Sequence, residues 1–232
     1  MSRLRFKILV SILTLFGFFL FENRENTQAE QNKQELVCFR WAFGAIVGTD
    51  NDRRLVAVTR DTVLKTGDKL KMLVELKERC FVYLIYHTGD GKVAMLFPYD
   101  LKQFDASYQV LKKYYIPQGN RWFELDEETG LETFYLLASP KRLVALEGLY
   151  LEYIGADTKK KPGIAGEILK KIRQIKKKHR KFAFSAERPI PIGGNVRGIK
   201  TGPGERPPDI DPIAAEVSST HFYSRTFTID HQ

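Results

Sequence analysis

Residues 69–87 read KLKMLVELKERCFVYLIYH, and this stretch decides the fold. In its first half, apolar residues from Leu70 to Leu76 alternate with lysines and a glutamate, a period typical of a strand with one face in water. In its second half, residues 81–86 are apolar or aromatic without a break, which indicates a central strand buried on both faces. The stretch therefore predicts two neighbouring strands of a β-rich domain.

Short apolar runs on both sides of this stretch extend the same pattern. Asp90-Gly91 separates residues 81–87 from the next run and is a hairpin signal, because both residue types tolerate positive φ. Pro98 ends that run because it has no N–H to donate to a sheet. Further strands are predicted over residues 36–47, 55–59, 93–97, 114–117, 122–125, 132–138 and 222–229.

Two helices are predicted after most of the strands. Ser139-Pro140 can cap and start the first helix, and Gly155 can end it. The second can start at Pro162, and its apolar residues fall within an arc of about 140°. These residues are Ile164, Ala165, Ile168, Leu169, Ile172 and Ile175. We therefore expect an α+β fold, namely a mainly antiparallel, sandwich- or barrel-like β-domain with two following helices and a C-terminal closing strand.

The positive charge of the chain is concentrated in the second helix. Residues 159–181 contain nine lysines and two arginines against one glutamate, a net charge of +10, whereas the whole chain carries +9. The helix is thus amphipathic, and its cations could bind an anionic surface such as lipid headgroups or an acidic polymer. Alternatively, they form a solvated face while the isoleucines pack on the sheet. The candidate residues are Lys170, Lys171, Arg173, Lys177, Lys178 and Arg180.

The N-terminus has the parts of a secretory signal peptide. Three cationic residues precede an uncharged stretch over residues 8–21, and Thr27-Gln28-Ala29 supplies small residues at a cleavage site. We therefore expect an exported protein, periplasmic or secreted, whose mature chain starts at Glu30; retention of the segment as an anchor is the alternative. The expected organisation is a signal peptide over 1–29 and a β-rich domain over 30–155. Residues 156–232 would add the basic helix, a Gly/Pro-rich loop and the last strand.

Export also affects how the two cysteines are interpreted. Cys38 and Cys80 are the only cysteines, and an oxidising compartment would allow them to pair. The alternative is two buried thiols that behave as small apolar side chains. The sequence leaves both states open.

Motifs for catalysis are missing from the sequence. Gly89-Asp90-Gly91-Lys92 lacks the spacing of a phosphate loop and is better explained as a hairpin turn. The four histidines lack metal-binding spacing, and Asp126-Glu127-Glu128 is typical of a solvated turn. We therefore expect no catalytic residue, no metal ligand and no cofactor. Among many aromatic residues, Tyr99 and Trp122 lie beside loops and are candidates for a partner-binding surface.

Several short segments, taken in order, resemble a bacterial family. They are Leu64 to Leu70 (LKTGDKL), Cys80 to Ile85 (CFVYLI), Gly91-Lys92, Leu96-Phe97-Pro98, Tyr115-Ile116-Pro117, Gly130-Leu131-Glu132 and Leu137-Ala138-Ser139-Pro140. Together they resemble the domain of unknown function 4384 over roughly residues 60–150. The resemblance implies a small β-rich module found in bacterial exported and multidomain proteins, and it supplies no catalytic residues.

Three functions fit these observations. The first is a non-enzymatic envelope module that binds a protein or another envelope component. The second is a module that uses the basic helix on an anionic surface, and the third is an unrecognised hydrolase. Nucleic acid is disfavoured as a partner by export, although the charge alone would permit it. Membrane contact is expected only through the uncleaved signal peptide or the basic helix.

Overall fold

The computed structural model of the chain describes residues 36–49, 52–180, 185–189 and 208–232. Leu36–Gln232 forms one compact unit, and the following description concerns that unit alone. The predicted signal peptide lies outside the described residues. Among the described residues, no helix has the length and apolar character needed to cross a membrane.

The first sheet, sheet A, is built around the long first strand. Its main order is β10-β11-β1-β4-β7, with β2 also paired to β1 and β8 to β4. Every pairing in it is antiparallel. Its strands are β1 (Leu36–Val47), β2 (Arg54–Ala57), β4 (Lys69–Leu76), β7 (Lys113–Ile116), β8 (Phe123–Glu124), β10 (Ser185–Pro189) and β11 (Ala215–Thr220).

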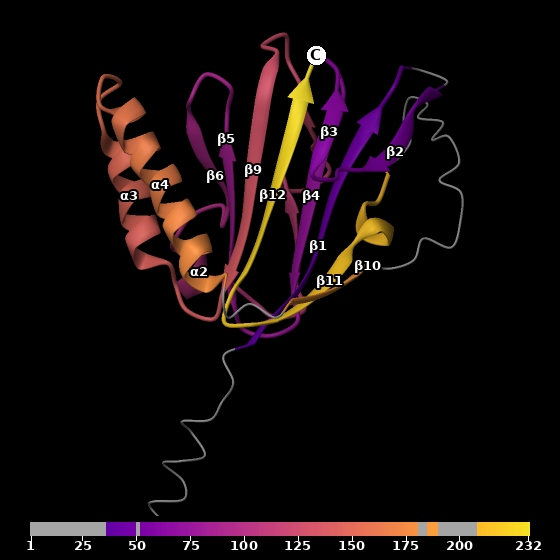
Figure 1. Cartoon of the computed structure of the whole chain (residues 1–232). Helices are drawn as coiled ribbons and strands as arrows, with labels where there is room; N and C mark the ends of the chain where they lie inside the picture. The colour runs from indigo at the N-terminus through magenta and orange to yellow at the C-terminus, as the bar shows by residue number, and fades with distance from the viewer. Residues whose placement is uncertain (1–35, 50–51, 181–184, 190–207) are drawn as a thin grey trace, which may run out of the picture. The chain divides into compact units, whose positions relative to one another are not determined.

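The second sheet, sheet B, places the last strand of the chain between strands from its middle. Its order is β3-β12-β9-β5-β6, and all neighbours are antiparallel except β3 and β12, which run parallel (Figure 1). Its strands are β3 (Asp61–Leu64), β5 (Phe81–His87), β6 (Val93–Phe97), β9 (Gly130–Ser139) and β12 (Tyr223–His231).

The two sheets pack face to face and enclose the main core. Alternate residues of each strand point inward, so that Phe43 of β1 meets Phe134 and Phe227 of sheet B, and Phe39 meets Tyr223. The rings of Phe43 and Phe134 lie edge to face, with 5.1 Å between their centroids. The expected fold class is confirmed as an antiparallel sandwich with helices, and the sheets do not close into a barrel.

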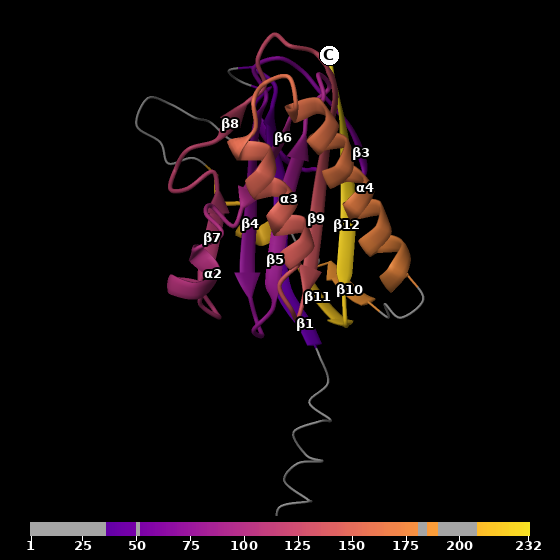
Figure 2. The ribbon, with the colours of Figure 1, turned by 90° about the vertical axis from the view of Figure 1, so that its left-hand side faces the viewer.

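Helices α3 (Val144–Gly155) and α4 (Lys161–His179) form a third layer over the outer face of sheet B, as Figure 2 shows. The predicted isoleucine face of α4 is buried there, and Ile172 is fully buried. A short helix, α2 (Gln103–Ala106), adds Phe104 to the same apolar cluster. The apolar side of the basic helix therefore packs on sheet B of the sandwich.

The outer face of sheet A is also covered, by the segment around the 3-10 helix η2 (Asp211–Ile213). Ile210 is fully buried against β1 at Gly44, where an added Cβ would lie 3.0 Å from Ile210 Cγ2. The adjacent Ile213 Cδ1 and Leu55 Cδ1 would both lie 3.1 Å from it. Glycine at this position therefore allows the covering segment to approach the strand closely.

This covering segment explains one difference from the sequence-based expectation. We expected β4 to expose one face to water, but Lys71 and Glu75 on that face are buried. Arg40 and Lys77 hold the Glu75 carboxylate at 2.8 and 2.6 Å. Burial alone would raise the pKa of Glu75, but the hydrogen bonds and charges of these two cations outweigh it and lower the pKa. Charged residues in an alternating strand therefore do not by themselves show that the face is exposed to solvent.

Candidate anion-binding site

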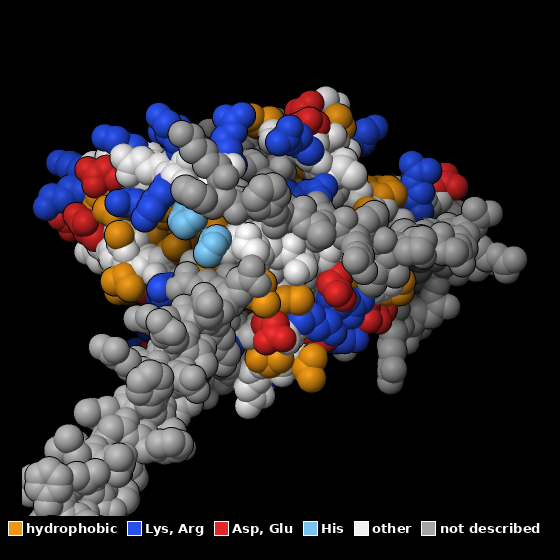
Figure 3. Space-filling view, turned by 60° about the horizontal axis from the view of Figure 1, so that its bottom comes forward, with side chains coloured by type: hydrophobic (Ala, Val, Ile, Leu, Met, Phe, Trp, Pro, Cys, Tyr) orange, Lys and Arg blue, Asp and Glu red, His pale blue; other side chains and the backbone are white. Residues whose placement is uncertain are grey.

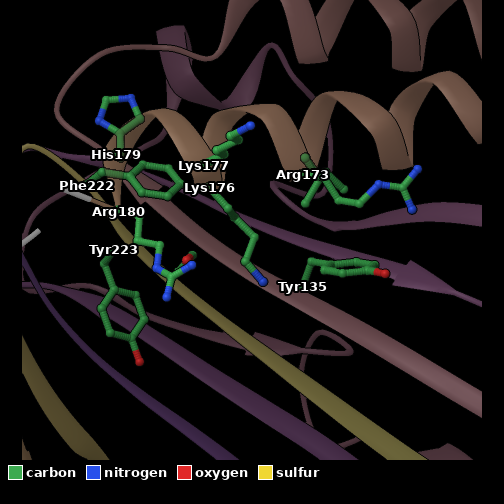
Figure 4. A pocket seen from close by; sticks show the side chains of 10 residues that line it. Tyr135, Arg173, Lys176, Lys177, His179, Arg180, Phe222 and Tyr223 are labelled. Atoms are coloured by element: carbon green, nitrogen blue, oxygen red, sulfur yellow. The ribbon is translucent and has the colours of Figure 1, made fainter.

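A hollow of about 510 Å³ lies between the C-terminal half of α4 and strands β9 and β12 (Figure 4). Its floor and walls combine apolar, aromatic and cationic side chains. The described residues that line it are Tyr135, Ile172, Arg173, Lys176, Lys177, His179, Arg180, Phe222, Tyr223 and Ser224. We refer to this hollow as the α4 pocket.

The position of α4 on the sheet places its cations at the pocket. Burial of Ile172 fixes the rotation of the helix, and Arg173, Lys176 and Arg180 follow on one flank at spacings of three and four residues. Lys176 extends from the helix towards the strands, with Tyr135 on one side and Arg180 on the other, as Figure 4 shows. The fold thus brings three cations from one helix flank against an aromatic wall.

Lys176 is the most enclosed of these cations. It is half-buried, and its Nζ donates a hydrogen bond of 2.7 Å to Thr226 Oγ1 in β12. Burial, with a smaller contribution from the charge of Arg60, lowers the pKa of Lys176 below its ordinary value. A charge in such a partly dehydrated site interacts with an added anion more strongly than a fully solvated lysine does.

His179 closes the pocket at the end of α4. Its ring stacks on Phe222, with 4.7 Å between centroids and 26° between planes. Burial lowers the pKa of His179, and the nearby Lys178 and His221 lower it further, so the imidazole is neutral at pH 7. Lysine and arginine side chains gather beside histidines on the face at this end of the unit, as Figure 3 shows.

The charged residues that line the pocket are all cationic. Four of its lining residues are lysine or arginine, and none of the described lining residues is acidic. Within the described part of the chain, no salt bridge joins Arg173, Lys176, Lys177 or Arg180 to a carboxylate. The arrangement can therefore hold an anion of moderate size with its apolar part against the aromatic rings.

The predicted cations divide between the pocket and the outer surface. Arg173, Lys177 and Arg180 line the pocket, whereas Lys170, Lys171 and Lys178 do not. Among the ionisable residues of the pocket, sequence reasoning missed Lys176 and His179. At 100° per residue both fall inside the arc of apolar residues that faces the sheet, and a cation and an imidazole within that arc were the available signal.

Tyr99 and Trp122 lie on the other side of the sandwich, near Tyr115. The Tyr99 hydroxyl donates a hydrogen bond of 2.6 Å to the Tyr115 carbonyl oxygen, and Tyr99 borders a second hollow of about 520 Å³. Trp122 is half-buried, with its ring 5.6 Å from Lys71 Nζ. Both predicted surface residues therefore have internal contacts, and their role in partner binding stays a prediction.

On this side of the molecule, Lys71 ties the loop over residues 119–121 to strand β4. Its Nζ donates to the carbonyl oxygens of Gly119 and Arg121 at 2.6 and 2.8 Å. Burial lowers its pKa, while the charge of Asp209 opposes that shift. All of these contacts are within the chain, so we assign Lys71 to loop stability.

Both cysteines are free thiols in this structure, so of the two states that the sequence left open it contains the unpaired one. The reason lies in strand alternation. Phe39 points into the inter-sheet core, so its neighbour Cys38 points to the outer face of β1, whereas Cys80 is fully buried in that core. The Cys80 thiol instead faces the Cys38 carbonyl oxygen at 3.9 Å. Burial raises the pKa of both thiols, to about 12 for Cys80.

The remaining titratable residues that the structure describes do not assemble into a recognisable reactive centre. Among the described residues, no group of three or more histidines, cysteines or acids could hold a metal ion. Glu132 is buried at one end of the inter-sheet core and accepts a hydrogen bond from the Tyr86 hydroxyl. Burial, and after it this hydrogen bond, raises the pKa of Tyr86. His231 is buried nearby on β12, with its Nε2 3.2 Å from Thr66 Oγ1.

Comparison with known proteins agrees with the resemblance drawn from the sequence. The model of a family described as domain of unknown function, DUF4384, matches residues 63–142. The similarity to this family is thus confirmed for a segment that runs from the end of β3 to just before α3. No curated protein and no solved structure matches the chain. Strands β1 and β12 and both long helices, including α4, lie outside the matched segment.

Proposed function

We propose that this protein is an exported, non-enzymatic binding module of the bacterial envelope whose ligand is an anionic envelope component held in the α4 pocket. The observation that carries the proposal is the group of four cations beside aromatic rings in this pocket, with no acidic residue among its described lining residues. Export is supported by the pattern of residues 1–29, and the non-enzymatic role by the missing catalytic motifs of the sequence.

The chemistry of the pocket favours a phosphate attached to a small organic body. Arg173 and Arg180 present planar guanidinium groups that suit phosphate or carboxylate oxygens, and Lys176 adds a point charge between them. Tyr135 and Phe222 offer ring faces for the rest of the ligand. A glycerophosphate headgroup and an acidic polymer share the anionic chemistry, and the headgroup adds a compact carbon backbone whose C–H groups can pack on the ring faces.

The lysines of the last turn have a structural role as well. Lys176, Lys177 and Lys178 lie where the C-terminal end of the helix dipole is negative, which favours cations. That effect accounts for basic residues in the last turn. It does not account for the hollow beside them or for Arg173, which lies three residues before the last turn.

A titration of the purified protein with an anionic ligand distinguishes ligand binding from a purely structural role of these cations. sn-Glycerol 3-phosphate should bind with a dissociation constant that rises steeply with salt concentration, because the interaction is ionic. Lys176→Met should weaken the affinity at least tenfold, whereas the matched change Lys170→Met on the exposed face should leave it within twofold. Equal effects of the two variants, or no binding by the wild type, would reject the pocket.

A second titration identifies the ligand class. Poly-glutamate carries the charge without a phosphate or a glycerol body. If it binds as tightly as sn-glycerol 3-phosphate per anionic group, the protein recognises charge alone and the headgroup assignment is wrong. Export has its own test, since N-terminal sequencing of the periplasmic or secreted form should begin at Glu30.

A further inference from the structure

The second hollow, of about 520 Å³, lies between strand β7 and the short helix α2. Residues 112–115 line it from the strand, and most of its other lining residues lie between positions 99 and 107. We refer to it as the β7 hollow. It shares no described lining residue with the α4 pocket, and its lining residues all fall within the segment that the family model matches. The β7 hollow is therefore a separate candidate site, which the proposed function leaves unused.

Gln103 places a buried amide group at the β7 hollow. The residue is 8% exposed, and its Oε1 accepts a hydrogen bond of 2.9 Å from the Tyr99 N–H. Because an N–H can only donate, this bond fixes which amide atom is the oxygen. Nε2 has no hydrogen-bond partner among the described residues, yet it is not sealed off from solvent. Its N–H groups are thus available to a ligand in the hollow.

The charged groups at the hollow add further donors. Lys102 and Lys112 are exposed there, and neither forms a salt bridge within the described part of the chain, whereas Lys113 already does. Asp100 is the one carboxylate among the described lining residues, and its Oδ1 accepts a bond of 2.8 Å from the Lys102 N–H. Two ammonium groups and a buried amide thus surround a hollow with a single acid. Such a set of donors suits a carboxylate.

Tyrosine side chains supply the apolar part of the hollow. Tyr99 and Tyr115 are half-buried, and Tyr114 between them in the lining is 4% exposed. A saccharide ring matches such a surface, because it has C–H groups over its faces and hydroxyl groups around its edge. Each hydroxyl can both donate and accept, so it can also use the Asp100 carboxylate and the exposed Ser107.

We infer that the β7 hollow binds a saccharide that carries a carboxylate. In this arrangement the carboxylate accepts hydrogen bonds from Lys102 Nζ and Gln103 Nε2. The C–H groups of the sugar ring pack against the tyrosines, and its hydroxyl groups bond to Asp100. The hollow of about 520 Å³ has the size of a pocket for such a small ligand.

The edge of β7 argues against an extended peptide in the same place. The strand is the last in the main order of sheet A, and an edge strand can pair with an added peptide strand. At β7, however, the Tyr99 hydroxyl already donates to the Tyr115 carbonyl oxygen at 2.6 Å. The strand is also only four residues long and is followed by Pro117. These features protect an edge from strand pairing and favour a compact sugar over a peptide.

A titration of the isotope-labelled protein with D-glucuronate, followed by NMR, tests the inference. The sugar should shift the side-chain NH₂ signals of Gln103, with a dissociation constant on the order of 1 mM because a monosaccharide makes few contacts. D-Glucose has the same ring without the carboxylate and should bind at least about tenfold more weakly. The affinity for D-glucuronate should also fall as salt is added.

Variants locate the binding and control for charge. Lys102→Met removes one donor and should raise the dissociation constant about tenfold. Lys159→Met, the same change at an exposed lysine that lines neither hollow, should leave the constant unchanged. Gln103→Glu keeps an acceptor for the Tyr99 N–H but replaces Nε2 with an oxygen, so it should abolish binding. If circular dichroism shows that Gln103→Glu does not fold, the comparison of the two lysine variants decides.

Several outcomes would overturn the inference. They include equal affinities for D-glucuronate and D-glucose, and no saturation at about twenty times the expected dissociation constant. Triglutamate that shifts the same signals and binds more tightly than D-glucuronate would identify a peptide site instead. Loss of D-glucuronate binding in Lys176→Met, with binding intact in Lys102→Met, would place the sugar in the α4 pocket. The two sites are otherwise independent, so failure of one leaves the other standing.

Discussion

The hydroxyl oxygen of Tyr83, on β5, lies 2.5 Å from Oε1 of Glu147, on α3, and this hydrogen bond joins the helical layer to sheet B. The same carboxylate accepts hydrogen bonds from Arg142, the shortest of them 2.7 Å. The Tyr83 oxygen also accepts a bond from the Leu143 N–H. Burial and the bond to Glu147 raise the pKa of Tyr83 well above its ordinary value, so the phenol stays protonated.

Replacement of Glu147 should therefore destabilise the fold. Glu147→Ala removes a buried acceptor from Tyr83 and the partner of Arg142, and we expect a loss of about 2 to 3 kcal/mol in the free energy of unfolding. Urea denaturation followed by tryptophan fluorescence measures the change. The control is Glu152→Ala on the exposed side of the same helix, which should change stability by less than about 0.5 kcal/mol. Equal losses in the two variants would contradict the role given to Glu147.

A substitution that introduces a negative charge should affect stability differently on the two faces of α4. Ile172 is fully buried, and Ile172→Asp places a carboxylate in an apolar contact, so we expect a loss of about 3 kcal/mol or more in thermal or urea unfolding. Lys170→Glu on the exposed face should change stability little, because solvated charges contribute little. A stable Ile172→Asp variant that loses ligand binding would show that the apolar face binds a partner.

The cysteines should differ in accessibility. In the folded protein a maleimide should label Cys38 slowly, because its partly exposed thiol has a raised pKa, and should label Cys80 only after unfolding. Mass spectrometry of intact protein counts the labels, and Cys38→Ser should remove native labelling altogether. If the denatured, unreduced protein took up no label, the thiols would be bridged and the strand geometry described above would be wrong.

Anion binding in the α4 pocket should strengthen at acid pH. Burial and the charges of Lys178 and His221 hold the pKa of His179 below the ordinary histidine value, so the imidazole is neutral at pH 7 and gains its charge only in more acidic solution. Protonation adds a cation to the pocket, and the affinity for sn-glycerol 3-phosphate should therefore rise between pH 7 and pH 5. The phosphate itself loses negative charge in this range, which acts in the opposite direction. The comparison is therefore made with His179→Gln, in which the rise specific to His179 should be absent.

Local sequence patterns predicted much of the sandwich, but not the contacts that depend on its assembly. The apolar run of β1 and the basic helix were predictable, because burial in each follows a regular period. The burial of Lys71 was not, since its partners Gly119 and Arg121 lie about fifty residues away. Strand β11, with sequence AEVSST, has too few apolar residues for a period to be recognised.

The candidate site shows the same division between local pattern and assembly. The cations of α4 could be recognised in the sequence, but not which of them meet the strands. Lys176 faces Thr226 only because α4 crosses β9 and β12 with Ile172 beneath it. That crossing is a tertiary property and leaves no local pattern in either segment.

The place of β12 inside sheet B bears on how the protein is made. This strand pairs with β9 along its whole length and with β3 on its other side, so sheet B has a gap until β12 is present. A chain still on the ribosome cannot close the sandwich before β12 has been synthesised, because β12 follows every other described strand in the sequence. The inter-sheet core therefore stays incomplete until residues 223–231 have emerged, and the facing edges of β3 and β9 stay unpaired until then. A tag that displaces β12 should impair maturation of the whole unit, however far it lies from the α4 pocket.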